Sequence, residues 1–245
     1  MIMSTFWTRE VFTRKELWDF VHSADPDVTE ATFSYILFDL RRKGKLRDVG
    51  TSIYTKGDKV EFQRSTDKMM TNLLDHLKRT SSLEGDYDIW TTEWLNEFME
   101  LQATSAMYIL EVDKYSMERV FFSLRDTFPN VFSKPDRAVI ETYITGVSDA
   151  IIIWPLISRA PINKDRLVPF PTLEKILVDL FCDTDLFYAY QGSQLVQIFQ
   201  SALSNYPINF SRLFGYANRR NKQQEIKAFL LKHTDTKTAI NSTTK

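Results

Sequence analysis

The sequence of 245 residues predicts an α+β, that is mixed α/β, fold, in which an N-terminal helical module with a two-stranded hairpin precedes a mixed α/β domain with a helical end. Three observations lead to this prediction. Helix caps and turn residues alternate over residues 13–59, apolar strand-like runs follow at 106–112 and 150–154, and apolar residues recur at helical spacing after residue 171. The expected domains are 1–66 and 67–233, followed by a polar, disordered tail at 234–245.

The N-terminal part carries the signals of two helices joined by a turn. Thr13 and, three residues later, Glu16 form a capping box for a first helix. Pro26 disfavours helix at the residue before it, and Thr29 can then cap a second helix at 29–43, whose apolar residues recur at helical spacing. This pattern predicts a helix-turn-helix.

Two short strand-like runs follow the second helix, at 45–49 and 52–56. Gly44 supplies the left-handed residue that commonly ends a helix, and Gly50 with Thr51 marks the turn between the two runs. Helix, turn, helix and two-stranded wing is the order of a winged helix-turn-helix, whose second helix reads the major groove of DNA. We therefore predict that the N-terminal domain binds double-stranded DNA.

The basic residues of this segment strengthen the prediction. They gather where the second helix ends and the hairpin begins, where phosphates beside a major groove would lie. In isolation such a run more often only caps a helix, but the helix–helix–hairpin order around it favours DNA contact. Polar side chains in the first turns of the helix can reach base edges. The predicted DNA-binding residues are Thr32, Ser34, Tyr35, Arg41, Arg42, Lys43, Lys45, Arg47, Thr51 and Lys56.

Composition restricts the class of protein. The net charge of -1 means that any nucleic-acid surface is a local patch. The only cysteine, Cys182, excludes an intrachain disulfide and is typical of a reducing compartment. No apolar segment of signal-peptide length precedes Arg9, and the apolar run at 150–157 is too short to span a bilayer. We expect a soluble, cytoplasmic protein with no membrane partner.

The sequence offers no complete set of catalytic or metal-binding residues. Its three histidines are scattered, and neither G-x-G-x-x-G nor a Walker sequence is present. The stretch Gly-Val-Ser-Asp at 146–149 resembles a nucleotidyltransferase turn, but Ile151 stands where the second metal-binding carboxylate is needed. Asp86 and Asp88 are interpreted as part of an acidic loop. We therefore predict no catalytic residues, no metal, no cofactor and no enzymatic activity.

Five phrases of the sequence point to a known family. They are GTSIYTKG (50–57) in the wing and, in the C-terminal half, PLISRAPI (155–162), PTLEKILVDLF (171–181), YPIN (206–209) and YANRR (216–220). With these phrases in this order, the chain outside its tail resembles the AbiEi-type antitoxins of abortive-infection (AbiE) toxin–antitoxin systems. The wing departs from that pattern, because related wings commonly carry a basic residue and then glycine before the tyrosine, whereas Thr51, Ser52 and Ile53 precede Tyr54 here. A wing without a basic tip is expected to hold the minor groove less well.

The resemblance implies a function for each half of the chain. In that family the winged helix binds operator DNA and represses the operon. The C-terminal domain is implicated in countering a cognate nucleotidyltransferase toxin, and the system is classed as type IV because the two proteins need not form a stable complex. The DNA contacts that the resemblance implies lie on 29–43 and 50–56. The implied antitoxin or structural motif residues are Arg159, Pro161, Glu174, Lys175, Asp179, Tyr216, Arg219 and Arg220.

The charged motif residues also have a purely physical interpretation. Glu174 and Lys175 are adjacent and cannot pair as i,i+4 residues do, so at least one of them is expected to reach another element. Arg219 and Arg220 end a predicted helix, where cations suit the dipole, or they pair with Glu174 or Asp179. We favour a structural ion-pair role for these residues over a partner-binding role.

The sequence thus predicts a DNA-binding transcriptional autoregulator and antitoxin. Because a monomer this weakly basic should bind poorly alone, we expect two copies on the DNA. Two alternatives stay open. One is a winged-helix protein whose C-terminal domain is an unrecognised or degenerate nucleotidyltransferase-like enzyme, and the other is a protein-interaction module that does not bind DNA. A nucleotidyltransferase gene immediately downstream would favour the first interpretation.

Overall fold

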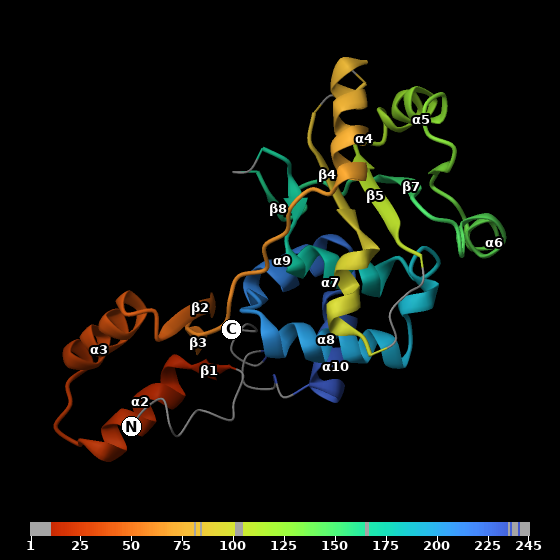
Figure 1. Cartoon of the computed structure of the whole chain (residues 1–245). Helices are drawn as coiled ribbons and strands as arrows, with labels where there is room; N and C mark the ends of the chain where they lie inside the picture. Colours follow the sequence, from red (N-terminus) through yellow and green to blue (C-terminus); the bar gives the residue numbers. More distant parts are fainter. Residues whose placement is uncertain are drawn as a thin grey trace. The chain divides into compact units, whose positions relative to one another are not determined.

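The computed structural model describes residues 11–80, 82–83, 85–100, 105–164, 167–234, 236 and 240 (Figure 1). The chain is a mixed α/β protein with a helical C-terminal end, as predicted. Its contacts divide it into two compact units. Unit 1 comprises Met1–Phe62 and Phe199–Lys245, and unit 2 comprises Gln63–Ile198. This division differs from the expected domains, because the last helices group with the N-terminal segment.

Two further expectations concern the chain ends and membranes. Of the expected disordered tail at 234–245, only 234, 236 and 240 are among the described residues, and the side chains of Thr236 and Ile240 are buried. Over the described part of the chain, no helix combines the length and the apolar character that a membrane crossing needs.

Unit 1 begins with two helices between short strands. In chain order these elements are β1 (Phe12–Thr13), α2 (Arg14–Ala24), α3 (Glu30–Arg42), β2 (Leu46–Gly50) and β3 (Ile53–Lys56). The strands form an antiparallel sheet in the order β1-β3-β2. The two helices and the hairpin therefore follow the order expected from the sequence, with β1 as an additional strand. Assignment to the winged helix-turn-helix class stays a prediction.

The predicted caps explain where these helices start and stop. Thr13 Oγ1 accepts a hydrogen bond from the Glu16 amide at 3.2 Å, and the Glu16 carboxylate accepts one from the Thr13 amide at 2.8 Å, so the capping box is confirmed. Thr29 Oγ1 caps α3 by accepting from the Thr32 amide at 3.2 Å. Gly44 follows α3 with a φ of +64°, the conformation expected of a helix-ending glycine.

The C-terminal helices complete unit 1. Helix α8 (Ser193–Asn205) enters the unit at Phe199, and α9 (Phe210–Arg219) and α10 (Gln223–His233) follow. The rings of Phe199 and Phe229 lie 5.1 Å apart, and α9 contacts β2. Lys59 Nζ donates to the Leu203 carbonyl at 2.6 Å. Such contacts join segments far apart in sequence, which explains why the contact division differs from a division at residue 66.

Unit 2 is built on a four-stranded sheet with the order β4-β5-β7-β6. Its strands are β4 (Tyr87–Thr91), β5 (Met107–Val112), β6 (Val131–Ser133) and β7 (Ala150–Pro155). β4 is antiparallel to β5, whereas β5, β7 and β6 are parallel. The chain passes from β5 to the edge strand β6 and then returns to form β7 between them. The shorter elements are η1 (Thr92–Phe98), α6 (Arg137–Val139), η2 (Ile140–Ile144), β8 (Ile162–Asn163), β9 (Phe170–Pro171) and η3 (Tyr188–Tyr190).

Helices cover both faces of this sheet. Helices α4 (Lys68–Arg79) and α5 (Met117–Arg125) pack on one face, where their apolar residues form a buried cluster with Ile89, Leu110 and Ile153. Helix α7 (Leu173–Cys182) contacts the opposite face through side chains that alternate with these along β4 and β5. Unit 2 is therefore a sheet between two helical layers.

Candidate functional sites: an exposed helix and a buried charge cluster

One side of α3 is buried and the other is exposed. Phe33 and Leu37 are each 1% exposed and hold the helix against the core of the N-terminal module. On the opposite side Tyr35 is 65% and Phe38 is 56% exposed. Sequence reasoning missed Phe38, although its position three residues after Tyr35, away from the apolar side, is a signal that could have identified it.

The structure places most of the predicted DNA-binding residues at the surface. Arg47 and Lys56 are partly buried, whereas the other eight are exposed: Thr32, Ser34, Tyr35, Arg41, Arg42, Lys43, Lys45 and Thr51. The first seven residues of that list lie on α3 or in the turn that follows it, and Thr51 lies at the tip of the hairpin. Eight of the ten predicted residues can therefore be reached from solvent, and their role in DNA binding stays a prediction.

The basic run is balanced by neighbouring carboxylates, which the sequence interpretation did not anticipate. Arg41 lies 3.3 Å from Asp48, Arg42 and Lys43 lie 3.1 and 2.6 Å from Asp39, and Arg47 lies 3.2 Å from Glu61. Lys45 has no ion pair with a described residue. The hydrogen bond from Lys43 lowers the pKa of the Asp39 carboxyl. Such pairs at the surface are weak and screened by salt, so a phosphate group can replace the carboxylate.

A second group of charges is fully enclosed in unit 2. Lys175 Nζ, on α7, lies 2.5 Å from Glu111, 2.8 Å from Asp179 and 3.2 Å from Asp88. Lys175 and Asp88 are 0% exposed, and the two other carboxylates are 3% exposed. The expectation that Glu174 or Lys175 reaches another element is confirmed, because Lys175 bridges to β4 and β5. We name these four residues the Lys175 cluster.

The sheet register explains why the cluster needs its lysine. Asp88 of β4 lies directly opposite Glu111 of β5, and like charges in this position repel. One ammonium group therefore serves three carboxyl groups. Burial raises the pKa of Glu111 well above its usual range and that of Asp88 to about 6, although the Lys175 charge opposes both shifts. Among the described residues, neither oxygen of Asp88 has a hydrogen-bond partner of good geometry, which also favours its neutral form.

The Lys175 cluster corrects one interpretation of the sequence. Asp88 was expected in an acidic surface loop, and this is wrong, because β4 begins at Tyr87 and turns Asp88 toward α7. Asp88 and Glu111 were not among the predicted site residues. The signal was a carboxylate within each of two otherwise apolar strands, where charged residues are rare unless they are paired.

The remaining motif residues are distributed over both units. In unit 2, Glu174 is buried on α7, Pro161 is partly buried, and Arg159 is exposed in the turn after β7. In unit 1, Tyr216 is buried on α9, and Arg219 and Arg220 end that helix. These last two stand where cations suit the helix dipole, as one of the two interpretations of the sequence predicts.

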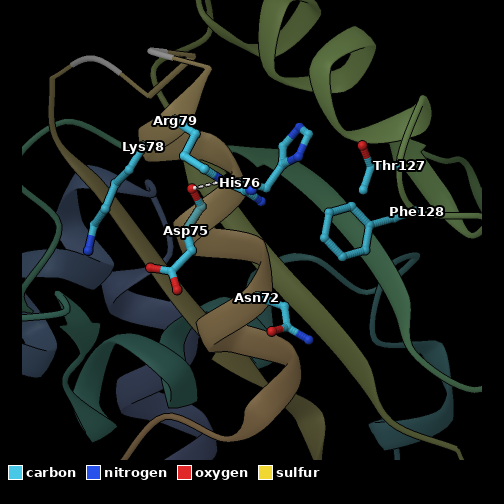
Figure 2. A pocket seen from close by; sticks show the side chains of 7 residues that line it. All are labelled: Asn72, Asp75, His76, Lys78, Arg79, Thr127 and Phe128. Atoms are coloured by element: carbon cyan, nitrogen blue, oxygen red, sulfur yellow. Dashed lines mark hydrogen bonds between the residues drawn. The ribbon is translucent and has the colours of Figure 1, made fainter.

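The surface of α4 bears a shallow pocket of about 630 Å³ (Figure 2). Helix α4 contributes most of the lining, including His76, Lys78 and Arg79, and Phe128 faces the helix from the segment after α5. His76 Nε2 lies 2.8 Å from the Ser123 carbonyl oxygen, so this histidine holds α4 against α5. Lys78 and Arg79 stand in the last turn of α4, where basic side chains commonly complement the helix dipole. We therefore assign no reaction to this pocket.

Among the described residues, the stretch before β7 belongs to no group of side chains that could hold a metal ion. Asp149 lies in the turn at a φ of +57°, and the Tyr108 hydroxyl nearby donates to Asp67 at 3.0 Å. Burial, with the charge of Asp67 next, raises the pKa of Tyr108. Nowhere in the described ranges do three or more His, Cys, Asp or Glu side chains gather in an arrangement that could hold a metal ion.

Comparison with known proteins adds a family to this description. A search of curated proteins found no match. Residues 32–236, which include most of α3 and all of unit 2, match a family described only as a family of unknown function, DUF6577. Because the match covers most of the sequence, the chain belongs to the DUF6577 family.

Proposed function

We propose that this chain is a DNA-binding regulator of its own operon, with α3 as the helix that enters the major groove. The exposed row on α3 carries the proposal. Thr32, Tyr35 and Arg42 follow one another at helical spacing on the side opposite the buried Phe33 and Leu37. A helix anchored by one side to a hairpin-bearing module, with its other side exposed, is suited to major-groove recognition.

The chemistry of this row fits a DNA groove. Thr32 and Tyr35 can hydrogen-bond to base edges or phosphates, and Phe38 can contact the methyl group of thymine. Arg42 and Lys43 can exchange Asp39 for phosphate oxygens, with release of condensed counterions from the DNA. The carboxylates beside the basic run limit the affinity of one copy, which supports the expectation of two copies on double-stranded DNA.

We further propose, on the basis of the resemblance to AbiEi-type antitoxins, that the protein counters a nucleotidyltransferase toxin. Not all motif residues are equally suited to contact a partner. Lys175 and Asp179 are enclosed, and Lys175 holds α7 to the sheet, whereas Arg159 is exposed. The exposed motif residues are therefore the ones to test for the antitoxin role.

A second candidate function is protein binding through α3 without DNA. Tyr35 and Phe38 are both exposed on α3, and aromatic residues are enriched at protein interfaces. The partial neutralisation of the basic run by Asp39 and Asp48 also weakens its attraction for phosphate groups. The experiment that follows distinguishes the two.

The test is a binding titration of the full-length protein on two duplexes, one from upstream of its own coding sequence and one with the same composition in shuffled order. We expect Tyr35→Ala to weaken binding to the upstream duplex by about 1–3 kcal/mol and to affect the shuffled duplex much less, because base contacts carry the discrimination. Tyr115→Ala, at a tyrosine of unit 2 that is 83% exposed, is the matched control and should bind like the wild type.

Two outcomes would contradict the proposal. Equal binding of the wild type to both duplexes would refute the regulator function. Unchanged binding by Tyr35→Ala would show that α3 does not contact the DNA. The antitoxin role has a separate readout, which is survival of cells that co-express this protein with a nucleotidyltransferase toxin of the abortive-infection type. Tyr35→Ala should protect these cells while losing repression, and a wild type that gives no protection would refute the antitoxin role alone.

A further inference from the structure

Loops at the carboxyl edge of the unit 2 sheet line an open pocket of about 500 Å³, a size typical of small-molecule sites. Strands β5 and β7 are adjacent and parallel, yet the chain leaves them toward opposite faces. After β5 it continues into α5 on one face, and after β7 it leads to α7 on the other. Divergent connections of this kind define a topological switch point, where open α/β sheets bind their ligands.

The pocket is lined by the segments that diverge at this point. Asp113 and Ser116 come directly after β5, and Leu156, Ile157 and Arg159 come directly after β7. The Leu156 amide donates to the Val112 carbonyl at 2.8 Å and so ties the two segments together at the base of the pocket. The position of the pocket is therefore set by the sheet and does not depend on a single loop.

Arg159 lines the pocket from an unusual backbone conformation. The Ala160 amide donates to the Ile157 carbonyl at 3.0 Å and closes a tight turn, in which Arg159 has a φ of +58°. Turns of this kind usually place glycine or asparagine at the left-handed position, because other side chains are strained there. Strained residues of this kind occur preferentially at ligand sites. No described residue forms an ion pair with the Arg159 guanidinium, which is exposed.

The other polar residues of the pocket are more strongly constrained. Asp113 Oδ1 accepts a hydrogen bond from the Tyr115 amide at 2.9 Å, which fixes the orientation of its carboxylate. Asp86 and Lys164, which also line the pocket, pair with each other at 2.6 Å. Leu156 and Ile157 provide apolar surface. The pocket thus offers one cation without a described partner, one oriented carboxylate and an apolar wall.

We propose that this pocket binds a phosphorylated small molecule of the mononucleotide class. Arg159 contacts the phosphate, because the planar guanidinium fork matches two phosphate oxygens. Asp113 accepts hydrogen bonds from sugar hydroxyls, and the apolar wall of Leu156 and Ile157 covers a ring. This site lies within unit 2 and is independent of the DNA-binding proposal for α3.

Calorimetric titration of the full-length protein with AMP, ribose 5-phosphate, adenosine and inorganic phosphate tests the proposal. The wild type should bind AMP more tightly than the other three. Arg159→Gly should weaken AMP binding about tenfold or more through loss of the charged contact, and it should fold normally because glycine suits the left-handed turn. Arg159→Asn, which also tolerates this conformation, should give the same result.

Lys134→Gly provides the matched control. Lys134 is also exposed, follows the neighbouring parallel strand β6 and has a φ of +43°, but it is not among the residues that line the pocket. Its substitution should leave AMP affinity unchanged. The proposal is overturned if the wild type does not bind AMP, if Arg159→Gly binds AMP as the wild type does, or if adenosine or inorganic phosphate binds as tightly as AMP.

Discussion

Two lysine–aspartate pairs in this protein have almost the same local geometry and opposite surroundings. Lys43 on the end of α3 lies 2.6 Å from Asp39, and Lys175 on α7 lies 2.8 Å from Asp179, each pair four residues apart. The side chain of Lys43 is 58% exposed, and that of Lys175 is 0% exposed. The lengths of the ion pairs therefore do not distinguish them, whereas their solvation does.

The difference in solvation assigns different roles to the two pairs. At the surface, water and salt screen the attraction, so the Lys43–Asp39 pair can open and its cation can meet another anion. In the interior, an uncompensated charge is costly, and Lys175 is surrounded by Glu111 and Asp88 as well as Asp179. We infer that buried Lys175 fixes α7 on the sheet through Asp88 and Glu111, while the exposed pair stays available for binding.

The largest expected effect is that of removing the buried ammonium group. Lys175→Met keeps much of the side-chain volume but leaves three carboxyl groups without a cation, which should lower the free energy of unfolding by about 3–5 kcal/mol. Lys43→Met should lower that free energy far less, because its partner Asp39 keeps contact with water. Denaturant titrations of both variants at neutral pH measure the difference. Similar stabilities for the two variants would show that burial is not the deciding variable.

A smaller effect is expected from neutralising one excess acid of the Lys175 cluster. Burial raises the pKa of Asp88 from 3.8 to about 6, so the folded state binds a proton more tightly than the unfolded state does. The stabilising contribution of Asp88 is therefore fully present below pH 3.8 and is lost as the pH rises through about 6. Asp88→Asn should remove this loss, about 3 kcal/mol, and flatten the dependence of stability on pH between about 4 and 6.

Unfolding free energies of the wild type and Asp88→Asn, measured between about pH 4 and 6, test whether stability falls as the pH rises. Asp39→Asn is the exposed counterpart. Lys43 lowers the pKa of Asp39, so the stability that Asp39 contributes is present above its unfolded pKa and is lost as the pH falls. Identical pH profiles for wild type and Asp88→Asn would contradict the account of the Lys175 cluster.

The distance along the chain between interacting residues explains what the sequence can predict. The caps at Thr13 and Thr29 and the stop at Gly44 depend on residues a few positions apart, so the two helices and the hairpin could be predicted. The β1 strand could not, because its pairing with β3 joins Phe12 to Tyr54 across both helices. Local signals suffice for local structure, and long-range pairing requires the folded chain.

The candidate sites also differ in whether they depend on local signals or on long-range pairing. Exposure of the predicted α3 residues follows from helical periodicity, which the sequence displays directly. The Lys175 cluster depends on the strand register that sets Asp88 opposite Glu111 and on the packing of α7 against both residues. Neither can be predicted from residues a few positions apart in the sequence. The partners Asp48 and Glu61 of the basic run were missed for the same reason, since their positions depend on how the hairpin folds back.

The most direct test of the central claim, that the exposed cations of α3 are available to DNA, is the salt dependence of binding. The full-length wild type and Arg42→Ala are titrated on the upstream duplex at several salt concentrations. If Arg42 exchanges Asp39 for a phosphate, the variant should bind more weakly, and the slope of log affinity against log salt should fall by about one unit. Lys232→Ala, at an exposed lysine on α10, should keep the wild-type slope. An unchanged affinity and slope for Arg42→Ala would contradict the claim and leave the basic run as only a helix cap.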